Sequence, residues 1–374
     1  MTAPPDAPDA PDAFTAYRPR LRPEVLVSDT LLHGADTVHL IKDTGSGQSF
    51  KVGTKEHFLI SRMDGERSLG EIGAEYARVY GRRLAAANWR QLLGMLGKRG
   101  LLEGSPAAAP PPAPAEPRTL LRGSLRLVAD ADATTGRLHR AIGWALSPWC
   151  MVPLLVLAVV MEAVLAWHAG ELVSAAWDLF KNPVLLTAAA TLLWLSTALH
   201  ELAHGVVARH YGGHVSEIGL RWRLPVVIMY CTVDNFLYLS ARRHRIATAV
   251  AGAVMNLLFL LPFFAVWLYA PVDDATRGAL SGLLFLGSVQ GLSMLVPLPP
   301  LDGYKIFAQL AGATELAASS RAYLRLAVRR DPSARAYPRR ARTAYTAYGV
   351  GVPLVLGALV AAVVAIVHHL LTTG

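Results

Sequence analysis

Five apolar segments, each long enough to cross a bilayer, constrain the fold of this chain more than any other feature. A membrane-spanning helix needs about 20 predominantly apolar residues. Charged residues make up only 17% of the 374 residues, against about 25% in a typical soluble domain. The sequence therefore predicts a mainly α, polytopic membrane helix bundle. The five segments are 149–168, 184–208, 246–269, 278–297 and 348–371. A shorter apolar stretch, 224–239, is interrupted by Asp234 and Asn235 and predicts a re-entrant or interfacial segment.

The loops between these segments alternate in charge, which gives an expected topology. Arginines precede the first segment, follow the second and follow the fourth, whereas the other two loops each hold two acidic residues and one basic residue. Lys and Arg concentrate on the cytoplasmic side of membrane proteins. We therefore expect a multi-pass protein of the cell inner (cytoplasmic) membrane with a cytoplasmic N-terminus. The first 20 residues lack an apolar stretch, so no signal peptide is expected.

The net charge of +9 lies mainly beside the predicted spans. No zinc-finger or helix-turn-helix pattern accompanies these basic residues. We therefore expect the lipid bilayer, and not nucleic acid, to be the partner of this charge.

The second segment contains the pattern His200-Glu201-Leu-Ala-His204. Histidines four residues apart lie on one face of a helix, so both imidazoles can bind one metal ion. A glutamate between them can take a proton from a metal-activated water. A five-residue pattern also occurs by chance, but ionisable residues are costly inside a membrane span and are functional by default. The pattern predicts His200 and His204 as metal ligands and Glu201 as the catalytic base.

A catalytic zinc needs a third protein ligand and keeps one position open. Asp302 is the preferred candidate because three prolines end the preceding segment and Gly303 permits a tight turn there. The second and fourth spans also run in the same direction, so Asp302 and the histidines meet at the cytoplasmic boundary. The other candidates are His210, His214, Glu217 and Asp234. We interpret Glu162, another intramembrane acid, as a polar contact inside the bundle.

These motifs resemble the site-2 protease family of intramembrane zinc metalloproteases over residues 145–371. The resemblance rests on His200 to Gly205 in one span and on Leu301-Asp302-Gly303 after a later one. The segments Tyr230–Asn235 and Leu301–Tyr304 are closer to a bacterial branch of peptide zinc metalloproteases. The resemblance implies Zn²⁺ as the cofactor and hydrolysis of peptide bonds as the activity.

A third element, Gly252 to Asn256, resembles the family's Gly-Pro-x-x-Asn segment, with Ala253 in place of the proline. Val296 likewise replaces the Asn that precedes the proline of the family's aspartate motif. The resemblance implies that Asn256 contacts the substrate. The alternative for Asn256 is a hydrogen bond between two spans.

A peptide must be extended to expose its carbonyl group, and an edge strand can hold it by β-augmentation. Residues 215–223 alternate between polar and apolar side chains and predict such a strand. The alternative is a loop held at the interface by Trp222.

The first third of the chain predicts a small soluble domain at 24–103, between a disordered tail (1–23) and a Pro/Ala linker (104–117). The membrane metalloprotease domain follows at 118–374. Two alternating runs, 38–42 and 48–52, flank Asp43-Thr-Gly-Ser-Gly47 and predict a β-hairpin. Helical patterns follow at 54–63, 68–80 and 84–98, with Thr54 and Ser68 as expected N-caps and Glu71 at capping-box spacing. The expected fold is α+β and winged-helix-like.

Within this domain, Phe50–Gly53, Phe58–Gly65 and Ser68–Ile72 resemble the PqqD-like domain. Members of that family recognise leader peptides of ribosomally made, post-translationally modified peptides. The resemblance implies that a leader adds a strand beside Phe50, Lys51 and Val52 and packs on the third helix. The alternative is a small regulatory or dimerising domain that binds no peptide.

Both halves together predict a membrane-embedded zinc metalloendopeptidase that removes the leader of a precursor peptide. Co-expressed peptide-modifying enzymes or an exporter are possible further partners. Two alternatives stay open: cleavage of a membrane-anchored regulator, and a non-catalytic peptide-binding role in a maturation or export complex.

Overall fold

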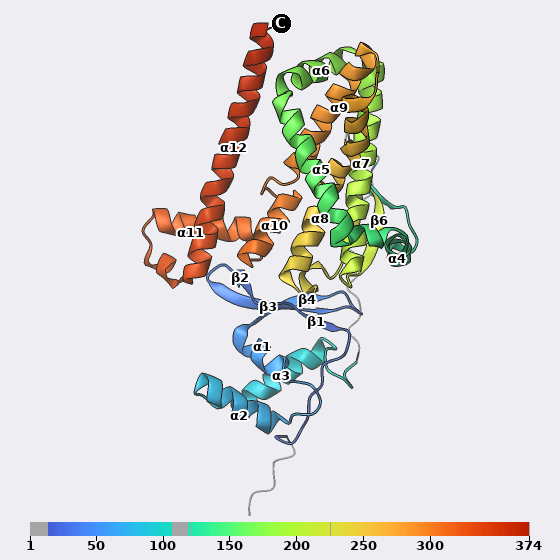
Figure 1. Cartoon of the computed structure of the whole chain (residues 1–374). Helices are drawn as coiled ribbons and strands as arrows, with labels where there is room; N and C mark the ends of the chain where they lie inside the picture. The colour runs from blue at the N-terminus through green and yellow to red at the C-terminus, as the bar shows by residue number, and fades with distance from the viewer. Residues whose placement is uncertain (1–13, 107–118, 120, 225, 374) are drawn as a thin grey trace, which may run out of the picture. The chain divides into compact units, whose positions relative to one another are not determined.

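The computed structural model describes residues 14–106, 119, 121–224 and 226–373 (Figure 1). The chain divides into two compact units, 1–114 and 115–374. The division falls within the predicted linker 104–117, most of which lies outside the described residues. Each unit is described by itself below.

The first unit combines a four-stranded antiparallel sheet with three helices. Strand β3 is central: β1 and β2 pair with one side of it and β4 with the other. The predicted hairpin is confirmed, with Leu40 of β3 opposite Lys51 of β4. The elements are β1 (Val25–Val27), β2 (Leu31–His33), β3 (Asp36–Asp43), β4 (Ser49–Gly53), α1 (Thr54–Ile60), α2 (Leu69–Tyr80) and α3 (Ala86–Lys98).

A side-chain cap marks the start of α2, whereas the cap that we expected for α1 is absent. Ser68 caps α2 in a capping box, with its hydroxyl accepting from Glu71 N–H and its own N–H donating to the Glu71 carboxylate. The expected Thr54 cap is wrong, because Gly53 is the N-cap of α1 and makes no side-chain cap hydrogen bond. Thr54 is already helical, and its hydroxyl donates to Thr37 O at 3.5 Å.

The N-terminal segment contributes to the core of this unit, which corrects the predicted tail 1–23. Residues 1–13 lie outside the described residues, but Phe14 and Leu21 pack against the buried core. Leu21 N–H also donates to Met63 O at 3.1 Å. The core residues are Ile41, Val52, Leu59, Ile60, Met63, Leu69, Ile72, Tyr76, Trp89, Leu92, Leu96, Leu101 and Leu102.

The second unit is mainly helical, with one small sheet. Its strands are β5 (Arg122–Arg126), β6 (Val215–Arg223) and β7 (Val226–Val233). Its α-helices are α4 (Ala131–Ile142), α5 (Pro148–Trp167), α6 (Ala169–Lys181), α7 (Pro183–His210), α8 (Arg242–Tyr269), α9 (Asp274–Ser293), α10 (Asp302–Ala311), α11 (Leu316–Val328) and α12 (Arg339–Thr373). Short 3₁₀ helices are η1 (Gly143–Leu146), η2 (Phe236–Tyr238) and η3 (Pro332–Ala336).

Within the described residues, four helices are long and apolar enough to span a membrane: α5, α7, α8 and α12. The predicted number was five. The fourth predicted span, 278–297, lies largely in α9, whose glycines, serines and Gln290 lower its mean hydropathy. The four helices indicate a membrane protein. The membrane type and the orientation stay predictions.

The two ends of α5 carry exposed tryptophans, an arrangement typical of membrane interfaces. Trp149 and Trp167 are 89% and 88% exposed. They lie about 27 Å apart along the helix axis, close to the hydrocarbon thickness of about 30 Å. These residues are consistent with one full crossing of a bilayer by α5.

Helices α5 to α9 form one bundle, with α8 packed against α7, α9 and α5 (Figure 1). Small residues permit close approach, because a Cβ at Gly287 of α9 would lie 2.5 Å from the Leu260 side chain of α8. The apolar part of α12 stands apart from this bundle, and none of it is buried. One core cluster consists of Met161, Leu165, Leu172, Leu260, Phe264, Trp267 and Leu284.

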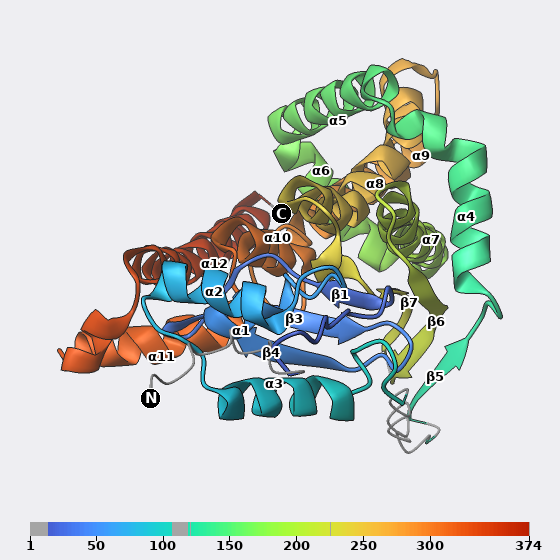
Figure 2. The ribbon, with the colours of Figure 1, turned by 90° about the horizontal axis from the view of Figure 1, so that it is seen from below.

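The predicted strand 215–223 is confirmed as β6, but it is not an edge strand. The order β5-β6-β7 places it in the centre, paired on both sides (Figure 2). The edge beside α7 belongs to β7, within the segment that we interpreted as re-entrant or interfacial. Any peptide added to this sheet near α7 therefore pairs with β7 and not with β6.

Candidate metal centre

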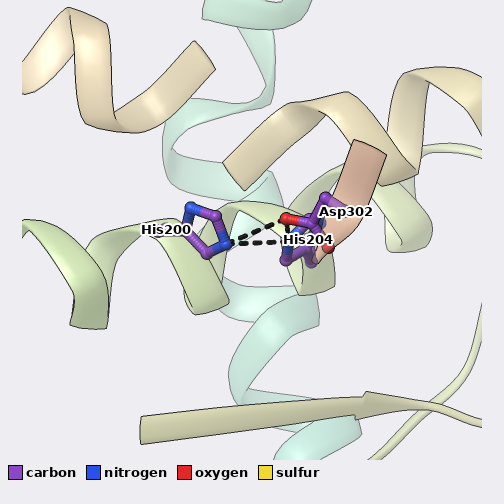
Figure 3. Close-up of side chains that lie close together, drawn as sticks. All are labelled: His200, His204 and Asp302. Carbon is purple, nitrogen blue, oxygen red and sulfur yellow. Dashed lines mark hydrogen bonds and ion pairs between the residues drawn. The ribbon is translucent and has the colours of Figure 1, made fainter. Parts of the chain in front are cut away.

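Three buried side chains from two distant segments converge in the second unit (Figure 3). His200 and His204 lie one turn apart on α7, and Asp302 is the first residue of α10. Asp302 Oδ2 lies 3.0 Å from Nε2 of each histidine. The two Nε2 atoms are 3.3 Å apart. The structure therefore brings together the three residues that the sequence predicts as metal ligands.

The spacing of these three atoms fits one small metal ion. Tetrahedral zinc binds nitrogen and oxygen ligands at about 2.0–2.2 Å, which places its ligand atoms about 3.3–3.6 Å from one another. The observed separations of 3.0–3.3 Å reach the lower end of that range. Two imidazoles and a carboxylate are also a donor set that zinc favours. The described residues thus fit a three-ligand site with an open fourth position.

Neighbouring groups fix two of the three side chains. Nδ1 of His204 lies 2.7 Å from Thr248 O on α8, so that nitrogen carries the proton and Nε2 faces Asp302. The Lys305 ammonium donates to Asp302 Oδ1 at 2.8 Å. Burial acts to raise the pKa of Asp302, but its contacts with His200 and His204 and the charge of Lys305 hold it well below its usual range. Asp302 is therefore a carboxylate, the form that binds metal.

Gly252 of α8 lies directly against the histidines. A Cβ at this position would come within 2.5 Å of His200 Nε2 and 2.6 Å of His204 Nε2. Only a residue without a side chain permits this approach. Gly252 belongs to the segment that resembles Gly-Pro-x-x-Asn, and the structure adds a steric reason for a glycine there. Lys305 and Thr248 were not expected, and no ligand pattern points to them.

Glu201 points to the neighbouring edge strand. Its Oε2 accepts a hydrogen bond from the N–H of Cys231 on β7 at 3.1 Å. The direction of the main-chain N–H and C=O groups alternates along a strand. Since the Cys231 N–H faces away from β6, the main-chain groups of every second residue of β7, counted from Cys231, also face away from β6. Glu201 therefore lies between the two ligand histidines in sequence and beside an extended backbone in space.

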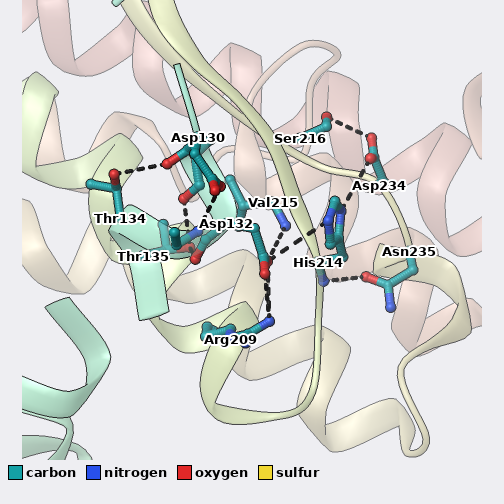
Figure 4. Close-up of polar contacts among 12 residues, drawn as sticks. Asp130, Asp132, Thr134, Thr135, Arg209, His214, Val215, Ser216, Asp234 and Asn235 are labelled. Carbon is teal, nitrogen blue, oxygen red and sulfur yellow. Dashed lines mark hydrogen bonds and ion pairs between the residues drawn. The ribbon is translucent and has the colours of Figure 1, made fainter. Parts of the chain in front are cut away.

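The other candidate ligands lie elsewhere in the fold. His214 contacts two carboxylates, Asp132 at 4.0 Å and Asp234 at 3.5 Å (Figure 4). Asp132 also pairs with Arg209 at 2.9 Å. These contacts join the start of α4, the end of α7 and the β6–β7 hairpin. They support the sheet beside Glu201 and leave Asp302 as the third ligand.

Two further candidates also have structural partners. His210 Nδ1 lies 3.0 Å from His139 Nε2. Glu217 accepts a hydrogen bond from Arg126, and this bond holds the pKa of Glu217 below its usual range. His210 therefore joins the end of α7 to α4, and Glu217 joins β6 to β5.

Polar residues inside the bundle make hydrogen bonds between helices. Asn256 is buried, and its Oδ1 accepts from Ser196 of α7 at 3.0 Å. This is the interhelical bond that we gave as the alternative; a substrate contact by Asn256 stays a prediction. Ser288 of α9 donates to Glu162 of α5 at 2.9 Å. The interpretation of Glu162 as a polar contact within the bundle is confirmed.

In the first unit, the predicted leader site falls on β4, which pairs only with β3 among the described strands. Phe50 is half-buried, with the Arg99 guanidinium 4.2 Å from its ring centroid. Lys51 is exposed, whereas the Val52 side chain is buried in the core. Val52 can therefore offer a peptide only its main chain.

Comparison with family models, curated proteins and solved structures finds no match for this chain.

Proposed function

We propose that the chain is a membrane-embedded zinc metallopeptidase that removes the leader of a ribosomally made precursor peptide. The observation that carries this proposal is the buried group of His200, His204 and Asp302, with Glu201 beside the edge strand β7. A purely structural polar cluster would not need a glutamate in that position. The donor spacing supports one metal ion, and the donor set favours zinc.

Zinc, when bound, supplies an activated water and polarises the scissile carbonyl group. The side chains of the protein do the rest. Glu201 accepts the proton of the attacking water and then donates it to the leaving amine. The Thr248 carbonyl keeps His204 in one orientation, and Lys305 does the same for Asp302. The cleaved peptide thereby gains one water across its C–N bond.

The outer edge of β7 offers a main-chain template for an extended substrate. An added strand would pair with outward-facing groups of β7 and would lie beside Glu201. Two of these groups have partners on α7, because Val227 O accepts from Trp194 at 3.3 Å and Cys231 N–H donates to Glu201, so the substrate would replace these contacts. This revises the sequence-based hypothesis, which assigned that role to 215–223. The scissile carbonyl, once extended, is free to approach the metal centre.

The first unit supplies the proposed capture of the leader. Strand β4 pairs only with β3 among the described strands, and Arg99, the residue that follows α3, lies over Phe50. A leader that adds a strand beside β4 would use the same type of contact as the substrate at β7. The charge pattern of the loops favours a cytoplasmic location for this unit, in the cell inner membrane.

The first test is cleavage of short precursor peptides encoded beside the gene, followed by mass spectrometry with detergent-purified full chain. We expect the wild type to release the leader. Glu201→Gln should lower the rate by about 10²–10⁴-fold, because it loses the general base. It should keep about one zinc ion per chain by elemental analysis, since no proposed ligand is changed.

Two controls separate the alternatives. His204→Ala should lose both zinc and cleavage. Binding of the precursor without cleavage by zinc-loaded wild type would favour a non-catalytic role in a maturation or export complex. Cleavage of a membrane-anchored regulator, and not of any precursor peptide, would support the proposed peptidase activity and contradict the proposed substrate.

A further inference from the structure

An open groove lies between α11 and the first turns of α12. Its volume is about 610 Å³. It is lined by Tyr323, Arg339, Arg342, Thr343, Thr346 and Ala347. Two guanidinium groups and two threonine hydroxyl groups thus come together in one concave surface, beside Tyr323. None of these six residues is acidic.

The groove has a rigid wall. Tyr345 of α12 is fully buried, and its carbonyl accepts a hydrogen bond from Ser320 of α11 at 2.6 Å. Tyr337 lies between Tyr323 and Tyr345, with ring centroids 5.1 Å and 6.1 Å away. This aromatic cluster holds α11 against α12 and keeps the shape of the groove.

The charge around the groove is strongly one-sided. The segment 316–342 contains eight arginines and only one acidic residue, Asp331. Hydrogen bonds from Ser333 lower the pKa of Asp331, and the charge of Arg329 adds to this effect. Arg340 donates to Ala311 O at 3.4 Å. Arg339 and Arg342 are the arginines that line the groove.

The position of the groove along α12 matches a lipid headgroup. The apolar part of α12 begins at about Tyr348, so the Arg342 backbone lies about 9 Å before it along the helix axis. The polar headgroup layer extends about 5–8 Å beyond the hydrocarbon on each side. An arginine side chain can direct its guanidinium across the remaining distance. Both hydroxyl groups lie nearer still to the hydrocarbon.

We propose that this groove binds the phosphate of an anionic phospholipid from the membrane in which α12 lies. Arg339 and Arg342 pair with the phosphate, and Thr346 donates a hydrogen bond to one of its oxygens. The Thr343 hydroxyl already donates to Arg339 O at 3.1 Å. The acyl chains follow the exposed apolar face of α12. The Tyr348 hydroxyl donates to Pro297 O at 3.0 Å, so the bound lipid steadies a helix that contacts the loop before Asp302.

The test is native mass spectrometry of the detergent-purified full chain, titrated with phosphatidylglycerol or phosphatidylcholine of equal chain length. Wild type should retain phosphatidylglycerol selectively. Arg339→Gln/Arg342→Gln should weaken this retention about twenty-five-fold, since each arginine near an anionic lipid contributes about fivefold. Thr346→Val, which removes one hydroxyl and no charge, should weaken it by a smaller factor.

The matched control is Arg329→Gln/Arg330→Gln, which removes the same charge from the same segment outside the groove. Its lipid selectivity should stay close to that of wild type. An equal loss of phosphatidylglycerol retention in both double variants would show that the lipid responds to the overall charge of the segment, and would overturn the proposed site. No loss of retention in either variant would also overturn it. Displacement of the lipid by glycerophosphate at equal concentration would show a site for soluble phosphates and would also overturn the proposal.

Discussion

Residues that bind no metal shape the proposed centre as much as the ligands do. The closest example is Gly252, whose missing side chain lets α8 pass against both imidazoles. A ligand pattern reveals the histidines, but only the packing of α7 on α8 reveals this requirement. The same holds for Thr248, which contributes a main-chain carbonyl.

Gly252→Ala should lower zinc affinity about ten- to a hundredfold, the usual cost of disturbing groups that orient metal ligands. The new methyl group would overlap the His200 and His204 rings and force them apart. Competition with a zinc chelator, followed by elemental analysis, measures the change.

Gly278→Ala is the matched control for this substitution. Gly278 lies on α9, and a Cβ there would meet no atom within 4 Å. This variant should bind zinc like wild type. Unchanged zinc affinity in Gly252→Ala would show that the helices can separate freely, contrary to the close packing described here.

At the scale of elements, the edge of β7 carries the proposed substrate contact. The N–H of Cys231 faces Glu201, so the N–H of Met229 faces outward as well, whereas that of Ile228 faces β6. A proline at Met229 would therefore remove an outward-facing N–H, whereas a proline at Ile228 would remove an N–H that faces β6.

Met229→Pro should lower kcat/KM for peptide cleavage about tenfold, the effect of one lost hydrogen bond of about 1–1.5 kcal/mol. It should keep its zinc, because the β6–β7 pairing is preserved. Cleavage kinetics and elemental analysis measure the two effects.

Ile228→Pro provides the contrast, since it removes a bond within the sheet and should lower thermal stability instead. Full activity of Met229→Pro would exclude pairing of the substrate with this position of β7.

Local elements could be predicted from the sequence, whereas the sheet of the second unit could not. The hairpin 38–52 and the Ser68 capping box depend on residues a few positions apart. The central place of β6 depends on β5, whose Arg126 pairs with Glu217 across 91 positions. The ligand group was predictable despite its 98-residue separation, because the chemistry of each partner restricts the choice.

At the scale of the whole molecule, the chain joins two units that are each compact. The core of the first unit consists of residues from that unit alone. If the first unit captures the leader and the second cleaves it, as proposed, the second binding event is intramolecular, with an effective concentration that can reach about the millimolar range.

The isolated first unit, residues 1–114, should fold by itself and lose stability as the pH falls from 7 to 5. Burial, together with nearby His39 and Arg62, lowers the pKa of His57 to about 4, whereas the unfolded chain titrates near 6.5. The unfolded state therefore binds more protons in this range, and the free energy of unfolding falls as the pH falls. Urea unfolding at each pH measures the effect.

His57→Gln should reduce this pH dependence, because the substituted side chain does not titrate. Most carboxylates of the unit already have their ionised form above pH 5, so they contribute little in this window. An unchanged slope in the variant would assign the dependence to other groups. Failure of residues 1–114 to unfold cooperatively would contradict their independence.

The length of α7 has a consequence for the supply of the second reactant, water. Its 28 residues extend about 42 Å, more than the hydrocarbon thickness of about 30 Å. A crossing of about 20 residues counted from Pro183 ends near Leu202, between the two ligand histidines. The proposed hydrolysis at this depth would draw on solvent at the membrane boundary, so the water it consumes would not have to cross the lipid.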